Sequence, residues 1–129
     1  MDFPTNLKYT EEHEWVLIEG DIATIGITDF AQSELGELVY VEVDTVGDTL
    51  DQNEVFGTVE AVKTTSELFM PVAGEVLEFN PALDESEGDD PTQVNNDPYG
   101  KGWIVKIKMS DPSQVEGLLS SEAYEGIVK

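Results

Sequence analysis

The chain has 129 residues, including 28 acidic residues and six lysines but no arginine or cysteine, so its formal net charge is −22. A surface this negative repels phosphate backbones and anionic lipids, which argues against nucleic-acid and membrane-surface binding. The lack of cysteine excludes disulfides, thiol nucleophiles and iron–sulfur sites. The length and the 40% hydrophobic fraction predict one globular domain over residues 1–129, with its core at about 14–109.

The sequence also indicates a location and an oligomeric state. The first residues, MDFPTNLKYTEEHEW, have neither the basic start nor the apolar stretch of a signal peptide. No run of apolar residues is long enough to span a membrane as a helix. The strong negative charge favours a monomer that docks on basic faces of partner proteins. We therefore expect a monomeric, cytoplasmic protein.

A hairpin and a short helix are predicted first along the chain. Residues Trp15–Ile18 and Ile22–Ile25 have strand composition and flank a glycine-containing turn, which is typical of a β-hairpin. Thr28 is a suitable N-cap for a helix at Asp29–Leu35, and Gly36 suits the left-handed position after its end. Four residues of this helix recur at helical spacing: Phe30, Ala31, Glu34 and Leu35.

The rest of the core is predicted as strands joined by turns. In order, these strands cover Leu38–Val43, Glu54–Val62, Glu67–Met70, Val76–Phe79 and Trp103–Met109. Gly57 lies inside a strand and therefore indicates a bulge or the close approach of another backbone. Regular alternation through Gly57 would put Val55 and Val59 on the same side of the strand. The predicted fold class is mostly β.

The C-terminal segment changes character and is predicted as two short helices at about 111–128. Asp111 is a suitable N-cap, and Gln114 completes a capping box for a first helix. Ser120 or Ser121 can cap the second helix, which continues through Val128. We expect both helices to cover an edge of the sheet.

Residues suited to catalysis or metal binding are scarce. His13 is the only histidine, and no G-x-S-x-G sequence supplies an activated serine for it. A zinc site would need further histidines or cysteines. The segment Asp84–Asp90 holds five acids in seven residues but lacks the spacing of a calcium loop. We expect a solvated loop there, no metal site, and a structural role for His13.

Lys63 has a distinctive sequence environment. It is the only charged residue in AVKTTS (61–66), and strand patterns precede and follow it, so we expect it at the tip of a hairpin. Gly47 lies sixteen residues before it, Glu60 three before it, and Gly74 eleven after it. By its position alone, such a lysine is typical of a solvated surface residue without a chemical role.

Four segments resemble, in order, those of the glycine cleavage system H-protein family. They are LKYTEEHEW (7–15), ATIGITDFAQSELGELVYVEV (23–43), GTVEAVKTTSELFMPVAGEVLEFN (57–80) and VNNDPYGKGWIVKIK (94–108). The spacing of Gly47, Glu60 and Gly74 around Lys63 is similar to the wider lipoyl-domain pattern. The resemblance implies a barrel-sandwich hybrid fold that carries lipoate in amide linkage to Lys63.

The resemblance also implies a function, which is that of a carrier and not of an enzyme. Such a carrier takes an aminomethyl group from glycine decarboxylase (the P-protein) and passes it to the aminomethyltransferase (the T-protein). Lipoamide dehydrogenase (the L-protein) reoxidises the dithiol, and a lipoylating enzyme attaches the lipoate. Because the family shelters the loaded arm in a cleft, Glu12, Glu14 and Glu67 are candidate carboxylates for holding the ammonium of the cargo.

The alternatives are other swinging-arm carriers and other roles. A biotin carrier would have methionine on both sides of the lysine, where this chain has Val62 and Thr64. A lipoyl domain of a 2-oxoacid dehydrogenase would have aspartate before the lysine and no C-terminal helices. The sequence does not distinguish a glycine cleavage carrier from an H-like protein that relays lipoyl groups to other enzymes. An acid–base hydrolase using His13 and Glu14 fits least.

The chain departs from the family pattern at a few positions. Ala61, Thr64 and Ala73 stand where the family usually has serine, alanine and serine. The segment between Leu83 and Val94 is longer and more acidic than usual. We expect this segment to change a docking surface without affecting the lysine.

Overall fold

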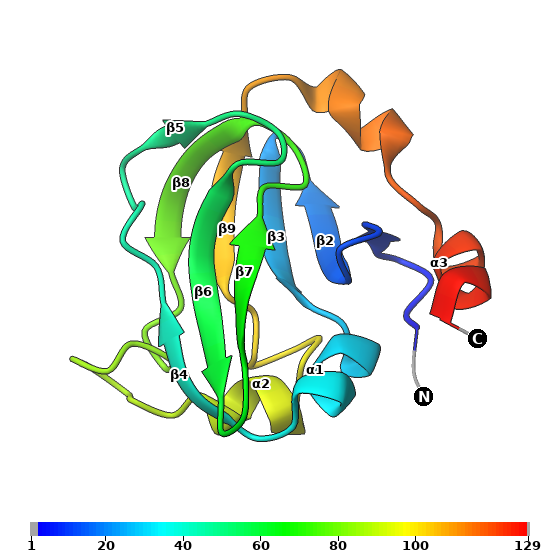
Figure 1. Ribbon diagram of the computed structural model, residues 1–129. Helices are drawn as coiled ribbons and strands as arrows, with labels where there is room; N and C mark the ends of the chain where they lie inside the picture. Colours follow the sequence, from blue (N-terminus) through cyan, green and yellow to red (C-terminus); the bar gives the residue numbers. More distant parts are fainter. Residues whose placement is uncertain (1–2, 129) are drawn as a thin grey trace.

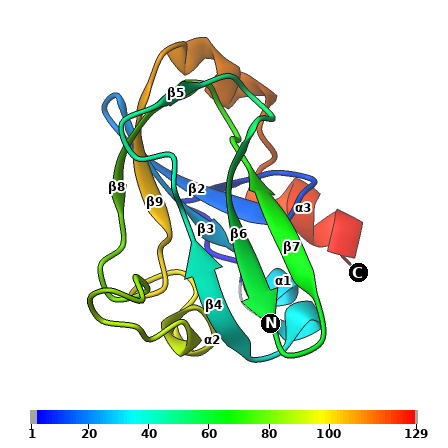
Figure 2. The same cartoon turned by 60° about the vertical axis from the view of Figure 1, so that its left-hand side comes forward.

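The structure is a computed structural model that describes residues 3–128, and it consists mainly of two antiparallel sheets that face each other (Figures 1 and 2). Within these residues one sheet has the strand order β1-β2-β3-β9-β8-β5 and the other the order β4-β6-β7. The strands are β1 (Lys8–Tyr9), β2 (Glu14–Glu19), β3 (Ile22–Ile27), β4 (Leu38–Glu42), β5 (Thr49–Leu50), β6 (Val55–Ala61), β7 (Thr65–Phe69), β8 (Gly74–Phe79) and β9 (Val105–Met109). The predicted mostly-β class is confirmed.

Apolar side chains from both sheets fill the space between them. Val16, Ile25 and Ile107 come from the six-stranded sheet, and Val41 and Val59 come from the three-stranded sheet. All five are essentially inaccessible to solvent. Because Val41 and Val59 are register partners in β4 and β6, the core fixes the base of the hairpin formed by β6 and β7.

The helix α1 covers Asp29–Leu35, which is the range that the sequence predicts. Thr28 Oγ1 accepts a hydrogen bond from the Ala31 amide at 3.1 Å, and Gly36, with a φ of 81°, ends the helix. None of the residues of α1 is fully buried. The helix therefore keeps a partly open apolar face. A second short helix, α2 (Thr92–Asn96), packs beside α1 and β4.

Strand β6 contains the bulge that Gly57 predicts. The register between β6 and β7 shifts between Val55 and Gly57. A Cβ atom at Gly57 would lie 2.6 Å from the carbonyl oxygen of Glu42, so the close backbone approach is also present. The shift reverses the side-chain alternation, and as a result Phe56 is buried while Val55 is 37% exposed. The expectation that Val55 shares the buried side with Val59 is therefore wrong.

The C-terminal segment contains α3 (Ser121–Val128), as predicted, but the element before it is a 3-10 helix, η1 (Pro112–Gly117). Asp111 caps this element as expected. Gln114, however, does not complete a capping box, because its side-chain oxygen accepts a hydrogen bond from the Ala73 amide at 2.7 Å. The Gln114 side chain therefore bonds to a backbone amide of another segment and is not available to cap an α-helix.

The edge of the six-stranded sheet is covered by the residue between the two C-terminal helices. Leu119 exchanges two backbone hydrogen bonds with Tyr9 of β1, at 2.9 and 2.8 Å. The prediction that both helices cover this edge is therefore corrected, because the linker pairs with β1 and α3 lies beside that strand. In residues 3–128 no helix has the length and apolar character needed to cross a membrane.

Candidate functional site

Figure 1 shows the hairpin formed by β6 and β7. Lys63 lies at its tip, between the end of β6 at Ala61 and the start of β7 at Thr65. A hydrogen bond from the Ala61 amide to the Thr64 carbonyl, at 2.8 Å, closes the turn. Val62 is 72% exposed and Lys63 is exposed beside it. Within residues 3–128 no group forms a hydrogen bond or ion pair with the Lys63 ammonium. The amine is therefore accessible and available for acylation.

The other residues of the lipoyl pattern are divided between the two sheets. Glu60 is exposed on β6, where its register partners are Tyr40 and Thr65. Gly47, with a φ of 94°, forms the turn before β5, and Gly74 begins β8. Neither glycine lies on the hairpin. They shape the sheet that packs behind it, where a side chain at Gly74 would collide with a backbone carbonyl of β9.

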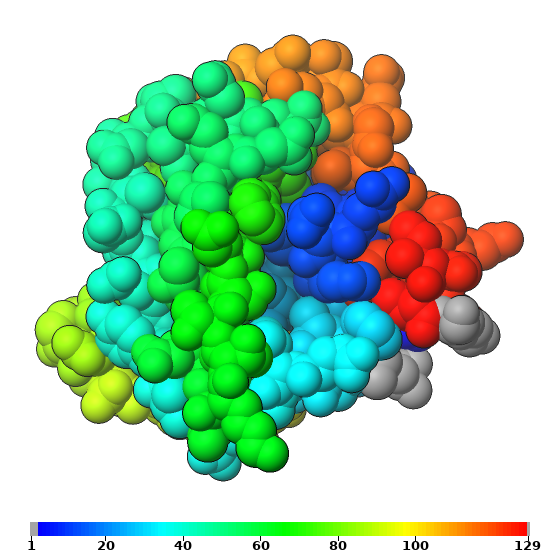
Figure 3. Space-filling view, in the orientation of Figure 1, coloured from blue at the N-terminus to red at the C-terminus, as the bar shows by residue number. Residues whose placement is uncertain are grey.

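A cleft with a volume of ≈390 Å³ lies between α1 and the hairpin strands. Figure 3 shows the hairpin as a ridge beside this helix. Ser66, on the wall of the cleft, is three residues from Lys63, which corresponds to about 10 Å of strand. The apolar lining of the cleft consists of Ile27, Phe30, Ala31, Leu35, Val59 and Leu68. A flexible apolar chain attached to the hairpin tip could therefore lie in this space.

Three exposed carboxylates stand at the cleft. Glu12 comes from the turn before β2, Glu34 from α1 and Glu67 from β7. The structure thus brings together two of the three acids that the sequence singles out, and it adds Glu34. The signal for Glu34 is the helical spacing that it shares with Phe30 and Ala31, because this face of α1 lines the cleft.

Glu14 does not line this cleft, although it follows Glu12 closely in sequence. Its side chain is 1% exposed. One carboxylate oxygen accepts a hydrogen bond from the Phe69 amide at 2.7 Å, and the other accepts one from Thr10 Oγ1 at 3.1 Å. The carboxylate therefore links β2 of one sheet to β7 of the other, behind the cleft.

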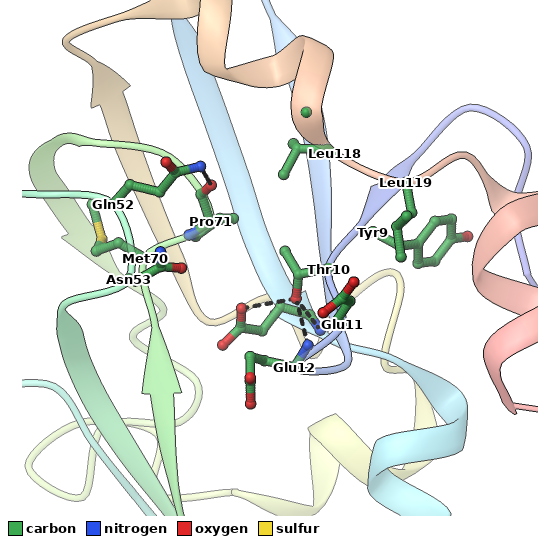
Figure 4. Close-up of a pocket in the computed structure, with 12 residues that line it drawn as sticks. Tyr9, Thr10, Glu11, Glu12, Gln52, Asn53, Met70, Pro71, Leu118 and Leu119 are labelled. Carbon is green, nitrogen blue, oxygen red and sulfur yellow. Dashed lines mark hydrogen bonds between the residues drawn. The ribbon is translucent and has the colours of Figure 1, made fainter.

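The environment of Glu14 changes its protonation. Glu14 borders a second hollow of ≈200 Å³, which Figure 4 shows with Thr10, Glu11 and Glu12. Burial raises the pKa of Glu14 from 4.5 to about 8, and this effect outweighs the hydrogen bonds from Phe69 and Thr10, which lower it. The buried side chain is thus largely protonated near neutral pH.

His13 is partly buried just before β2, as expected, and it also lines the cleft. Its Nδ1 atom lies 2.8 Å from the Tyr124 hydroxyl of α3. The ring centroid is 5.0 Å from that of Phe30, and the backbone has a φ of 67°, which is uncommon outside glycine. No sequence signal points to Tyr124, because it lies 111 residues from His13.

Comparison with known proteins decides the family. The sequence model described as Glycine cleavage H-protein matches residues 7–129. The chain belongs to the glycine cleavage H-protein family. H proteins are the non-catalytic, lipoate-carrying component of the glycine cleavage system, and this chain shares that carrier role. The alternative of an acid–base hydrolase is therefore wrong.

The similarity to individual H proteins extends over whole chains. The glycine cleavage system H protein of Bacteroides thetaiotaomicron is 57% identical over 128 residues, covering 99% of this chain and 98% of the relative. That of Chlorobium luteolum is 52% identical over 130 residues, with the same coverage. The crystal structure of the Mycobacterium marinum H protein superposes with a TM-score of 0.83 at 37% identity, covering 95% of this chain and 96% of that one. The expected lipoyl-domain-like fold is thereby confirmed.

Proposed function

We propose that Lys63 carries lipoate in amide linkage and that the chain moves an aminomethyl group between the enzymes of the glycine cleavage system. The P-protein loads the carrier, the T-protein unloads it, the L-protein reoxidises the dithiol, and a lipoylating enzyme attaches the lipoate. One observation carries the proposal: in a chain of this family, an exposed and unpaired lysine stands at a hairpin tip beside an apolar cleft.

The residues of the tip and the cleft fit a lipoyl group. Its acyl chain is apolar, as is the part of the cleft formed by Phe30 and Leu35. The carboxylates of Glu12, Glu34 and Glu67 match the ammonium of an aminomethyl cargo. When bound, lipoate supplies a five-membered disulfide ring that cannot reach the preferred dihedral angle near 90°, so it opens readily to a nucleophile.

Reconstitution tests the proposal. The lipoylated chain is mixed with P-, T- and L-proteins, glycine, tetrahydrofolate and NAD⁺, and we expect NADH formation that requires every component. The unlipoylated chain is the control, and equal rates with both would refute the proposal. In the source organism, deletion should abolish glycine cleavage. Loss of 2-oxoacid oxidation instead would indicate that the chain mainly relays lipoyl groups to other enzymes.

Neutralising the cleft carboxylates should shorten the lifetime of the cargo. Water that reaches the cargo carbon releases it as formaldehyde and ammonium and leaves a thiol on the carrier. Glu12 and Glu67 are exposed, so each contributes only a modest charge-assisted hydrogen bond to the ammonium. For the double variant Glu12→Gln/Glu67→Gln we expect formaldehyde release from the loaded carrier to be about fivefold faster.

Two further variants sharpen this measurement. Glu19→Gln/Glu122→Gln removes two exposed acids that do not line the cleft, and it should release formaldehyde at the rate of the unmodified chain. Glu14→Gln should show a smaller increase than the cleft variant, because Glu14 is buried behind the cleft. If the cleft variant and the surface variant release formaldehyde equally fast, Glu12 and Glu67 are ordinary surface acids.

The acidic loop at Asp84–Asp90 is suited to steering partners towards the carrier. Asp84 stabilises its turn by accepting hydrogen bonds from the Ser86 amide and hydroxyl at 3.0 and 2.8 Å. Glu85, Glu87 and Asp89 are exposed. Three negative charges can therefore be removed from the loop while the residue that stabilises its turn is kept.

Neutralising these three charges should slow association with the P-protein or the T-protein. For Glu85→Gln/Glu87→Gln/Asp89→Asn we expect an association rate roughly threefold lower at low ionic strength and a difference that disappears at high salt. Turnover at saturating carrier should not change. Glu19→Gln/Glu116→Gln/Glu122→Gln is the control with the same net charge. Identical rates and salt slopes in the two variants would show that the loop does not steer.

A further inference from the structure

A chain of hydrogen bonds connects α3 to the wall of the cleft. The Tyr124 hydroxyl lies 2.7 Å from Thr28 Oγ1 and 2.8 Å from His13 Nδ1. Thr28 Oγ1 also accepts the hydrogen bond from the Ala31 amide that caps α1. Tyr124 and Thr28 are completely buried, whereas His13 lines the cleft. Three side chains thus join α3, the start of α1 and the turn before β2.

The direction of these hydrogen bonds follows from the number of protons available. The buried Thr28 hydroxyl needs an acceptor for its own proton, and among residues 3–128 Tyr124 Oη is the acceptor within reach. The Tyr124 proton is then donated to His13 Nδ1. Burial raises the pKa of Tyr124, so the phenol keeps this proton. Because Nδ1 accepts, the ring proton of His13 resides on Nε2.

The Nε2 atom is the polar group that His13 can offer to a ligand. Within residues 3–128 every buried side-chain nitrogen and oxygen has a hydrogen-bond partner. Nε2 has no partner there, so it is accessible. The contact with Phe30 and the bond to Tyr124 fix the orientation of the ring in the cleft wall. The cleft therefore contains one oriented N–H donor beside its carboxylate acceptors.

We propose that His13 donates a hydrogen bond from Nε2 to the lipoyl arm, and that Tyr124 and Thr28 are positioning residues that fix its tautomer. This inference rests on the proposed attachment of lipoate to Lys63. The rest of the lining is apolar or carries carboxylate acceptors, apart from the hydroxyl of Ser66, so His13 Nε2 is its oriented N–H donor for the sulfur atoms of the arm, which are weak acceptors. A neutral imidazole supplies a donor without placing a second cation beside the cargo ammonium.

The tautomer can be measured directly because His13 is the only histidine in the chain. Two-bond ¹H–¹⁵N correlation spectra of the unlipoylated chain at mildly alkaline pH should show the Nε2–H tautomer alone. Tyr124→Phe should give a mixture with the Nδ1–H tautomer. Tyr9→Phe is the matched control, because the Tyr9 ring stacks on Tyr124 at 4.9 Å, and it should keep the original spectrum. A mixed spectrum for the unmodified chain would overturn the proposal.

The loaded carrier provides a second readout. His13→Asn should increase formaldehyde release about fivefold, which corresponds to one lost hydrogen bond. Tyr124→Phe should give a smaller increase, because part of the population keeps the Nε2–H tautomer. Asparagine is chosen at position 13 because it tolerates a positive φ. The double variant should be no faster than His13→Asn alone, because Tyr124 acts through His13. If the rate increases of the two single variants multiply in the double variant, or if Tyr9→Phe increases formaldehyde release equally, the substitutions loosen the packing in general. Either result would refute the positioning role.

The two proposals fail in different ways. If Lys63 is not the lipoylation site, intact-mass measurement shows this without reference to His13. If the tautomer is not fixed by Tyr124, the spectra of the unlipoylated chain show this without reference to lipoate. Loading the carrier should also shift the Nε2 resonance of His13. An unchanged resonance in a chain lipoylated at Lys63 would refute the contact with the arm.

Discussion

Lys63→Arg is expected to abolish both lipoylation and glycine-dependent turnover. Intact-mass measurement after incubation with a lipoylating enzyme should show one added lipoyl group on the unmodified chain and none on the variant. NADH formation in the reconstituted system should fall to background. The guanidinium is not acylated, although it keeps the positive charge at the tip. Because Lys63 is exposed and unpaired within residues 3–128, the free energy of unfolding should change by less than about 0.5 kcal/mol.

Lys101→Arg provides the matched control for this experiment. Lys101 is also exposed, but it lies in the turn before β9 and outside the hairpin. This variant should gain one lipoyl group and support normal turnover. Modification of Lys63→Arg to the same extent as the unmodified chain would assign the lipoate to a different lysine, and loss of modification in both variants would indicate a defect in recognition.

Glu14 is expected to make the stability of the chain fall as the pH rises. Its pKa is about 8 in the folded chain, compared with 4.5 for the ordinary carboxyl group of the unfolded chain. Between these values the folded state holds a proton that the unfolded state has released, so the free energy of unfolding decreases with increasing pH. The contribution is complete below the lower value, is lost above the higher one, and is on the order of 5 kcal/mol.

Denaturant unfolding of Glu14→Gln isolates this contribution. Glutamine keeps an oxygen that can accept the hydrogen bond from the Phe69 amide, but it cannot ionise. The free energy of unfolding of the variant should therefore fall less than that of the unmodified chain between about pH 5 and about pH 9. Mutual repulsion of the remaining acids affects both chains in the same way. Glu11→Gln, which removes an exposed neighbouring acid, should keep the original slope. Parallel curves for Glu14→Gln and the unmodified chain would show that Glu14 is already ionised at neutral pH.

The elements that the sequence predicts best are those whose signals are local. The bounds of α1 follow from the Thr28 cap, the helical spacing and Gly36, all within nine residues. The bulge at Gly57 is also predicted, but its effect on Val55 is not, because the register of β6 is set by pairing with β7. Local patterns thus predict that an irregularity occurs, while the neighbouring strand decides its consequence.

The features that the sequence does not predict depend on partners far along the chain. Gln114 satisfies the Ala73 amide, and a partly buried backbone group that needs an acceptor outweighs a local capping preference. Glu14 is buried because its partner is the Phe69 amide, 55 residues away. The family resemblance points to Glu12 and Glu67, and both line the cleft. Neither periodicity nor composition would have placed them at the same cleft.

The hairpin and the cleft differ in the sequence separation of the contacts that build them. The turn that presents Lys63 is closed by residues three positions apart, and such contacts form early because little loop entropy opposes them. The cleft is built from segments at 12–13, 27–35 and 59–68, and its wall is joined to Tyr124 near the end of the chain. During synthesis the lysine hairpin can therefore form well before α3 emerges. Presentation of the lysine is a local property of the sequence, whereas the cleft beside it is complete only when the end of the chain has been made.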